Sequence, residues 1–525
     1  MPAKSQESEP QPWQVPQRRV ARAAVQVMAL FVLSRALGLV REMVIGAAFG
    51  TRADYDAYLA AVRIPDLLFA LMAGGALASA FIPTFARYFA RDDREGGWRL
   101  ASAVVNLVLV SLTVAACLVW LAAPSIVALI LAPGFPPAQQ ALTVSLMRRM
   151  LVAPVLFGVS GVVMGILNAR QHFFLPALAP SMLNLSLIMT AWWLAPHLGV
   201  RALALGYVVG AVLHLAVQLP GLPRVGAQYH PILTLRDPGV REVLRLMAPR
   251  VLGLAVIHLN FLVNTNIASR LGEGAVSALN YAWLLMLLPQ GVFALAVATA
   301  VFPTFADQAA RGERDSMRRT LATTLRMVFF LTLPAAVGLL LLRRPLVALL
   351  FERGAFRASS TEAVAWALAF YALGLMGHAG VEILARAFYA LHDTWTPVWV
   401  GGLAMGLNVA LSLALTAAFG WMGLPPHGGL ALANSVATLL EMGGLLVLLR
   451  PRLGGLGGRA LALSVGRSLL ASAAMGGLLA IWQWALAGRT VLLVGGGGIL
   501  VGAVGYLLAG GLARAEELRM LRDVL

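Results

Sequence analysis

The sequence has a single cysteine and few charged residues. Cys117, the one cysteine among 525 residues, lies in an apolar run, so a disulfide framework and a thiolate metal site are both excluded. Charged residues make up 12% of the chain, against about a quarter in soluble proteins, whereas hydrophobic residues make up 60%. No long polar stretch leaves room for a separate catalytic domain of ordinary size. We therefore predict an all-α polytopic membrane protein.

Signatures of enzymes and ATP-driven pumps are also missing. The sequence contains no nucleophile elbow, Walker loop, HExxH pair or dinucleotide fingerprint, and its GGLGG and GGGG runs lack the strand–helix context of a phosphate loop. We expect no enzyme activity, no cofactor and no metal site. The net charge of +17 comes from arginines between apolar runs, where they set topology and contact anionic lipid, so no nucleic-acid partner is expected.

Fourteen apolar stretches are long enough to cross a hydrocarbon core of about 30 Å, which needs about 20 helical residues. The even number places both termini on one side, and the excess of Lys and Arg in the tail and alternate loops predicts that this side is cytoplasmic. The predicted spans are 23–48, 64–88, 100–130, 147–168, 175–196, 200–221, 246–270, 278–306, 320–342, 362–387, 396–418, 428–449, 463–486 and 490–512.

An internal repeat relates the two halves of the chain. AFIPTFARYFARDDREGGWR (80–99) matches AVFPTFADQAARGERDSMRR (300–319) at an offset of 220, and Pro176 and Pro397 are 221 apart. Six spans per repeat keep the orientation unchanged, which predicts two parallel, pseudo-symmetric six-helix lobes plus two C-terminal helices. The predicted domains are a cytoplasmic tail (1–22), an N-lobe (23–222), a cytoplasmic linker (223–245), a C-lobe (246–455), and the last two spans with a cytoplasmic C-terminus (456–525).

Charge inside the first span is the sharpest functional signal. Arg35 follows Ser34 near the middle of the span, and Arg41 and Glu42 lie two turns further on. Such charge costs about 2.5–3.5 kcal/mol per residue at a helix centre unless it faces a polar cavity or a partner. A guanidinium binds phosphate or pyrophosphate bidentately. We predict that these four residues line a substrate cavity, the alternative being that they bond neighbouring helices or mark the membrane rim.

A loop with the sequence TRADYDAYLAAVRIPDLL (51–68) is predicted to lead from the first span into the start of the second. It brings Asp54, Asp56, Arg63 and Asp66 to the mouth of the second span, where interfacial capping would explain most of them.

The tenth and eleventh spans carry further polar residues. One face of the tenth span carries His378, Glu382 and Arg386. This spacing favours a ladder of hydrogen-bonded charges over a metal site. His378 and Glu382 are suited to a proton-linked step. Asn408 of the eleventh span and Asn264 of the seventh could coordinate a cation or bond between helices. The second interpretation is favoured because no carboxylate is present to balance a sodium ion.

Several ordered stretches resemble the MurJ (MviN) family of bacterial lipid II flippases, within the multidrug/oligosaccharidyl-lipid/polysaccharide exporter superfamily. They are SRALGLVRE, DYDAYLAAVRIPDLL, GGALASAFIPTFA, GILNARQHFFLPALAPSMLN, LPQGVFALAVATAVFPTFA and RAFYALHDTWTPV. The resemblance covers about residues 24–515. It implies two lobes around a cationic cavity in the bacterial cytoplasmic membrane, with a groove beside the last two helices for a polyprenyl tail. The implied partners are undecaprenyl-pyrophosphate-linked disaccharide-pentapeptide, membrane lipids and cell-wall synthesis proteins.

The resemblance assigns roles to particular residues. Arg35 and Arg41 match the two first-helix arginines of the family, and Asp56 its acidic residue at the mouth of helix two. Arg63 stands where a basic residue is usual, and Arg386 lies in a family-like RAFYA stretch. Taken together, the residue pattern and the resemblance predict the substrate-binding residues Ser34, Arg35, Arg41, Glu42, Asp56, Arg63 and Arg386, and the ion-coupling residues Asn264, Asn408, His378 and Glu382.

The sequence also departs from the family pattern. Phe69, Gly74 and Leu284 occupy positions that are usually charged. Asn264 and Ser412 replace two aspartates of a sodium site described in the family, although Asn408 persists. The expected activity is movement of lipid II from the inner to the outer leaflet by alternating access, coupled to sodium, protons or neither. The alternatives are export of another polyprenyl-pyrophosphate glycan, cation-coupled export of small amphiphiles, and a non-transporting cell-wall scaffold.

Overall fold

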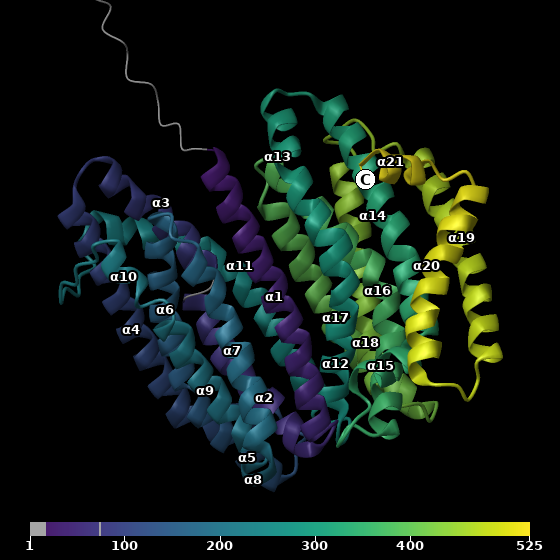
Figure 1. Ribbon diagram of the computed structural model, residues 1–525, viewed down its shortest axis with the longest axis horizontal. Coiled ribbons are helices and arrows are strands. Elements are labelled where there is room, and N and C mark those ends of the chain that lie inside the picture. Colours follow the sequence, from purple (N-terminus) through teal and green to yellow (C-terminus); the bar gives the residue numbers. More distant parts are fainter. Residues whose placement is uncertain (1–16, 73–74, 525) are drawn as a thin grey trace, which may run out of the picture. The chain divides into compact units, whose positions relative to one another are not determined.

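A computed structural model describes residues 17–72 and 75–524, which form helices and turns without a strand (Figure 1). This confirms the all-α prediction. Within the described residues, eleven helical stretches are long and apolar enough to cross a membrane. The remaining predicted spans fall on three stretches that carry several charged residues, namely α1 (Gln17–Phe49), α2 (Ala53–Met72) with α3 (Gly75–Ala90), and α11 (Pro238–Ala268).

The other elements of the first half are α4 (Arg94–Ser125), the π-helix η1 (Ile126–Leu131), α5 (Pro137–Met150), α6 (Val152–Ala169), α7 (Phe174–Trp193), α8 (Ala195–Leu198), α9 (Arg201–Ala216) and α10 (Gly221–Arg224). The second half contains α12 (Ala275–Pro289), η2 (Gln290–Leu295), α13 (Ala296–Ala310), α14 (Arg314–Leu341), α15 (Arg343–Phe351), α16 (Ala358–Ala390), α17 (Trp395–Trp421), α18 (His427–Leu449), α19 (Gly458–Ala485), η3 (Leu492–Gly496), α20 (Gly497–Leu512) and α21 (Glu516–Val524).

Several helices extend beyond the apolar spans predicted for them. The helix that contains the fourth span begins at Pro137 with α5, ten residues before the predicted start, and α11 begins at Pro238. Hydropathy detects only the part of a helix that lies in hydrocarbon, so amphipathic turns at its ends go unnoticed.

The loop predicted at residues 51–68 is wrong, because α2 is helical from Ala53 onwards. Its acidic residues Asp54 and Asp56 lie in the first helical turn, where carboxylates interact favourably with the helix dipole. Pro65 lies inside the helix and marks the boundary between two compact units of the chain.

The first compact unit consists of Met1–Val44, Pro65–Trp120 and Arg149–Leu252, described from Gln17 onwards. Its core is an aromatic and aliphatic cluster supplied mainly by α3, α4 and α6. Phe81, Phe85 and Trp98 are buried there, with Phe85 edge-on to Trp98 at 5.5 Å between ring centroids. Between transmembrane helices, such van der Waals packing replaces the hydrophobic driving force that acts in water.

The second unit consists of Ile45–Ile64, Leu121–Arg148 and Gly253–Leu525. In this unit α16 and α18 pack closely, and three glycines of α16 face α18. A Cβ atom on Gly374 would lie 2.6 Å from Ser435 Oγ, and one on Gly380 would lie 2.3 Å from Met442 Sδ. Small residues at this spacing let two membrane helices approach closely.

The repeat is visible in the backbone as well as in the sequence. Asp92 and Gly312, which are 220 positions apart, both adopt positive φ, at 57° and 70°. Gln171 and His392, 221 apart, do the same at 60° and 59°. The turns after corresponding helices are therefore built alike, which supports the two pseudo-symmetric six-helix lobes.

Asp393, which follows one of these turns, caps α17. It accepts hydrogen bonds from the Thr396 amide and hydroxyl, and Arg452 pairs with the same carboxylate. Burial raises the pKa of Asp393, but these hydrogen bonds outweigh it and lower the pKa to about 2.

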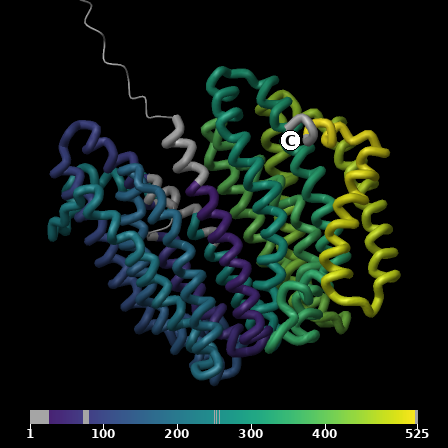
Figure 2. The backbone as a smooth tube through the Cα atoms, viewed as in Figure 1, coloured from purple at the N-terminus to yellow at the C-terminus, as the bar shows by residue number. Residues whose placement is uncertain are grey.

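The two C-terminal helices α19 and α20, which are yellow in Figure 2, form an antiparallel hairpin beside α14. Arg326 of α14 fastens the hairpin. Its Nε donates to Glu517 Oε1 at 2.7 Å, and its Nη2 donates to Glu516 Oε2 at 2.6 Å. The Glu517 side chain is only 1% exposed and also accepts from Ser464 of α19, whereas that of Glu516 is 59% exposed.

We expect Glu517→Ala to destabilise this attachment far more than Glu516→Ala. Removing the buried partner leaves Arg326 without its internal carboxylate, which costs about 3–5 kcal/mol, whereas an exposed pair contributes about 0–1 kcal/mol. Thermal unfolding of the detergent-purified variants measures the difference. Equal shifts in melting temperature for the two variants would contradict this assignment.

Candidate functional site

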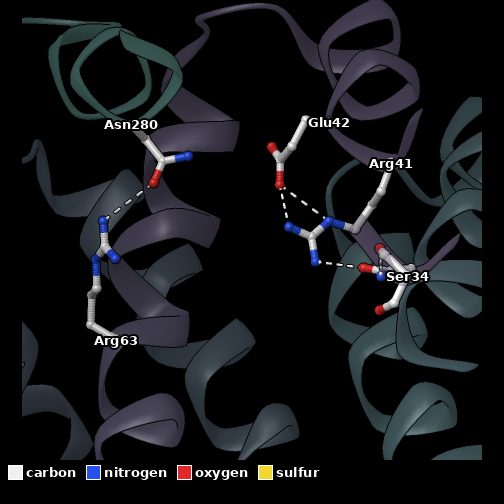
Figure 3. A network of polar contacts seen from close by, with 6 residues as sticks. Ser34, Arg41, Glu42, Arg63 and Asn280 are labelled. Carbon is white, nitrogen blue, oxygen red and sulfur yellow. Dashed lines mark hydrogen bonds and ion pairs between the residues drawn. The ribbon is translucent and has the colours of Figure 1, made fainter. Parts of the chain in front are cut away.

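Arg41 is held in place by partners on two helices of the first unit (Figure 3). Its Nε and Nη2 donate to Glu42 Oε1, the former at 3.1 Å, and its Nη1 donates to Asn184 Oδ1 of α7 at 3.0 Å. Asn184 in turn donates from Nδ2 to the backbone carbonyl of Ser34 at 3.1 Å. Because Glu42 is only 6% exposed, the charge of Arg41 is balanced at a nearly buried carboxylate.

Arg35 lies one and two-thirds turns before Arg41 and is bound quite differently. Its side chain is exposed and lies over the ring of Phe31, with Cζ 5.2 Å from the centroid. Among the described residues it has no hydrogen-bond or ion-pair partner. A guanidinium at mid-span that no side chain of the described residues neutralises favours an anionic ligand.

Asp56 is fully buried and caps a helix of the second repeat. Its Oδ2 accepts from the Gly274 amide at 2.7 Å and its Oδ1 from the Ser277 amide at 2.8 Å, at the N-terminus of α12. Glu273 makes the reciprocal contact. Its Oε1 accepts a hydrogen bond from the Ala53 amide at the start of α2, at 3.0 Å. The corresponding helices of the two repeats therefore cap one another within the second unit.

Arg63 lies in an aromatic setting in the second unit. Its Cζ is 5.3 Å from the ring centroid of Phe261, and its Nη2 is 3.5 Å from Asn280 Oδ1, the contact drawn in Figure 3. Trp283 packs edge-on against Phe261 at 5.9 Å. The ring of Phe261 and the amide of Asn280 both stabilise the guanidinium of Arg63.

The polar residues of α11 and α17 form a neutral amide cluster. Asn260 Oδ1 accepts from both Asn408 Nδ2 at 3.0 Å and Asn264 Nδ2 at 3.3 Å. Ser412 Oγ lies 3.4 Å from Asn408 Oδ1 and donates to it. Asn408 and Ser412 are both buried. The described members of the cluster include no carboxylate, so their dipoles are matched mainly to one another.

The face of α16 predicted to carry a charge ladder divides into two parts. Arg386 pairs with Glu382 one turn before it and also donates to the Glu382 carbonyl at 2.9 Å. His378 instead faces α18, with Nε2 3.1 Å from Asn434 Oδ1. In the first repeat, Ser160 lies 218 residues before His378, and His214 lies 220 residues before Asn434. Ser160 Oγ and His214 Nδ1 are 2.7 Å apart. A histidine therefore joins the corresponding helices in each repeat.

Two apolar substitutions of the family pattern lie in the described chain. Phe69 packs against Phe157 with ring centroids 5.3 Å apart, and Leu284 is half-buried on α12. The third position, Gly74, lies outside the described residues. Phe69 thus contributes to packing of the first unit, at a position where the family resemblance implies a cation.

Sequence reasoning missed three partners. Asn184 orients Arg41, Glu273 caps α2, and Asn280 contacts Arg63. An asparagine in an apolar run was the only available signal for Asn184. Nothing in the sequence indicated which arginine it would meet.

The described chain shares its fold with a solved transporter of the multidrug/oligosaccharidyl-lipid/polysaccharide (MOP) superfamily. The structure is similar to that of a multidrug resistance MATE family transporter of this superfamily, solved in an inward-facing conformation. The TM-score is 0.70 at 16% identity, over 84% of this chain and 99% of that one.

The family follows from closer comparisons. The family model "Lipid II flippase MurJ" matches residues 45–494. The lipid II flippase MurJ of Burkholderia cenocepacia is 37% identical over 428 residues, 80% of this chain and 82% of that protein. The probable lipid II flippase MurJ of Vibrio cholerae is 32% identical over 81% of this chain and 82% of that protein. The chain belongs to the MurJ family.

A solved structure agrees in fold. A lipid II flippase MurJ in an inward closed conformation superimposes with a TM-score of 0.79 at 23% identity, covering 95% of this chain and 99% of that one. The superposition extends over nearly the whole length of both chains. Eleven helices of the described residues are long and apolar enough to cross a membrane, and the chain belongs to a family of bacterial lipid II flippases, so it is a multi-pass protein of the bacterial inner membrane.

We expect Asp56→Ala to destabilise the protein strongly. The substitution leaves the Gly274 and Ser277 amides without their acceptor, at about 1–3 kcal/mol for each buried donor. Asp54→Ala is the matched control, because Asp54 pairs with the exposed Arg52 and its loss should cost less than about 1 kcal/mol. Melting curves in detergent report both values, and an Asp56→Ala variant as stable as Asp54→Ala would contradict the capping role.

Proposed function

We propose that this protein is a lipid II flippase, which moves the lipid-linked disaccharide-pentapeptide from the inner to the outer leaflet by alternating access. Membership of the MurJ family supports the cargo. Arg35 is the observation that carries the site assignment, because it is an intramembrane guanidinium whose positive charge is not balanced among the described residues.

In this mechanism the two first-helix arginines differ in role. Arg35 binds the pyrophosphate directly, through charge-assisted hydrogen bonds. Arg41 is oriented by Glu42 and Asn184, so it contributes a fixed cation whose charge is partly neutralised by Glu42. The polyprenyl tail stays in lipid while the head group crosses. No covalent step is needed, which fits a transporter, and both termini are proposed to be cytoplasmic.

Several predicted site residues receive narrower roles in this proposal. Arg63, with its aromatic surroundings, remains a candidate for the head group, and Arg386 is balanced by Glu382. Asp56 and Glu42 act on the protein itself, the first as a helix cap and the second as the partner of Arg41. Ser34 acts through its carbonyl, which fixes Asn184.

We infer that sodium is not the coupling ion at the amide cluster. Asn260 Oδ1 accepts two hydrogen bonds from within the cluster, and a sodium ion would have to displace them without gaining a carboxylate. No group of three or more His, Cys, Asp or Glu side chains suited to a metal occurs among the described residues. The proposed mechanism therefore contains no sodium-dependent step.

A second candidate is export of another polyprenyl-pyrophosphate glycan. Phe69 and Leu284 remove two cations from the family pattern, which would weaken or alter contacts with the head group. The pyrophosphate chemistry of Arg35 would be unchanged. A cationic drug as cargo is disfavoured because Arg35 would repel it.

We expect Arg35→Ala to abolish most rescue of a bacterium depleted of its own lipid II flippase. Loss of a charge-assisted bond costs about 1.5–3 kcal/mol, a decrease in cargo affinity of about tenfold to a hundredfold. Arg41→Ala should be impaired less, because Glu42 already balances its charge. Growth and lipid II translocation are measured at matched membrane abundance, with the exposed Arg344→Ala as control.

The same assay separates the alternatives. A silent Arg35→Ala alongside full rescue by the wild type would favour a non-transporting scaffold. Failure of a well-expressed wild type would favour a different glycan. In that case, Phe69→Arg and Leu284→Arg should restore rescue if the missing cations are the cause, which also excludes incompatibility with the host.

A further inference from the structure

Glu441 is an intramembrane carboxyl group that the proposed mechanism does not use. It lies eight residues before the end of α18, about 12 Å along the helix axis from that end. The side chain is mostly buried, and among the described residues it has neither a hydrogen-bond nor an ion-pair partner. Ionisable groups at such depth are retained where they bind substrates, ions or protons.

The carboxyl group occupies a space that glycine leaves open on α17. A Cβ atom on Gly401 would lie 3.3 Å from Glu441 Oε1, so the carboxylate lies directly against the backbone of α17. One turn further along α18, a Cβ atom on Gly444 would lie 3.5 Å from Val400 Cγ1. Glycines on both helices therefore hold α17 and α18 close together around Glu441.

The surrounding elements supply no cation to balance Glu441. On α16, Arg386 is already paired with Glu382, and Tyr389 lies within electrostatic range of both Glu382 and Glu441. α17 contains no titratable residue from end to end. The other titratable residues of α16 and α12 are Glu362, which pairs with Arg344, Tyr371, which packs edge-on against Trp283, His378, which faces Asn434, and Tyr281, which packs against Phe351 and Phe356. On α18 itself, His427 contacts the Ala363 carbonyl.

The charge at Glu441 depends on one proton. When ionised, its carboxylate is a negative charge in a region of low dielectric constant that no cation of α16 or α17 balances, because Arg386 is paired with Glu382 and α17 has no titratable residue. When protonated, the side chain is neutral. A proton needs only a single carboxylate oxygen, whereas a sodium ion needs several oxygen ligands, and α17 offers only glycines and apolar side chains beside Glu441.

We propose that Glu441 is a proton-binding site that couples the transport cycle to the proton gradient. The carboxylate takes up one proton from one side of the membrane and releases it to the other as the lobes alternate. The protonated carboxyl and the ionised carboxylate differ in the cost of burial, so the proton biases the conformation in which α17 and α18 enclose the side chain. The coupling step rests on the proposed flippase function, whereas proton binding itself does not.

Proton binding is tested on the purified protein by infrared spectroscopy during a pH titration. The wild type should show the carbonyl stretch of a protonated carboxyl group that Glu441→Gln removes. Glu313→Gln is the matched control, because Glu313 is exposed in the turn before α14 and undergoes the same chemical change. Glu441→Gln should fold normally, since the amide is isosteric with the protonated acid. A band that persists in Glu441→Gln overturns the proposal.

Coupling is tested in proteoliposomes with lipid II. A gradient of one pH unit, at one proton per cargo, shifts the steady-state distribution of lipid II by up to about tenfold in the wild type and in Glu313→Gln. Glu441→Gln should still flip lipid II but lose this shift. If Glu441→Gln keeps the pH response of the wild type, the coupling role is overturned. It is also overturned if the wild type responds to sodium gradients and Glu441→Gln loses that response. A wild type that flips no lipid II contradicts the proposed function, while the infrared result stands independently.

Discussion

The cost of placing charge in hydrocarbon governs the arrangement of this protein. Within the described spans, most ionised side chains have a partner on their own or a neighbouring helix, as Arg41 has in Glu42, Arg386 in Glu382 and Arg326 in Glu517. Each pair reduces the free energy of burying its members. Arg35 and Glu441 differ, because their charges are not balanced by another side chain in the described chain. Our proposals assign the first to an anionic lipid head group and the second to a proton.

The two repeats use the same helix contacts with different chemistry. In the first repeat an asparagine of α7 joins α1 through a charged arginine, whereas in the second an asparagine of α17 joins α11 through neutral amides. A histidine bridges corresponding helices in both repeats. Duplication thus preserved the packing framework, and divergence placed the cation in the first repeat and the unbalanced carboxyl group in the second. An anion site and a proton site in separate repeats can respond to the same rearrangement.

Much of the fold could be predicted because its signals are local. Apolar runs of span length, proline and glycine placement, and the matching AFIPTF and AVFPTF segments are readable without any knowledge of contacts. The prediction failed where hydropathy was silent, as at residues 51–68, where alternating charges suggested a loop and α2 is helical. The site was predictable to the level of which residues carry charge. Arg35, Arg41 and Glu42 stood out because charge in an apolar run is rare.

The sequence by itself determined the class of the protein, the parallel repeat and the presence of arginine in the first span. These depend on composition and periodicity, which each segment carries independently. Only the tertiary structure decided the partners. Asp56 meets the amides of Gly274 and Ser277 more than 200 residues away, Asn184 meets Arg41, and Glu441 lies against Gly401 without a counter-charge. The physical reason is that a hydrogen bond or ion pair needs atoms within about 3 Å. Helix packing alone determines which atoms, distant in the chain, come that close.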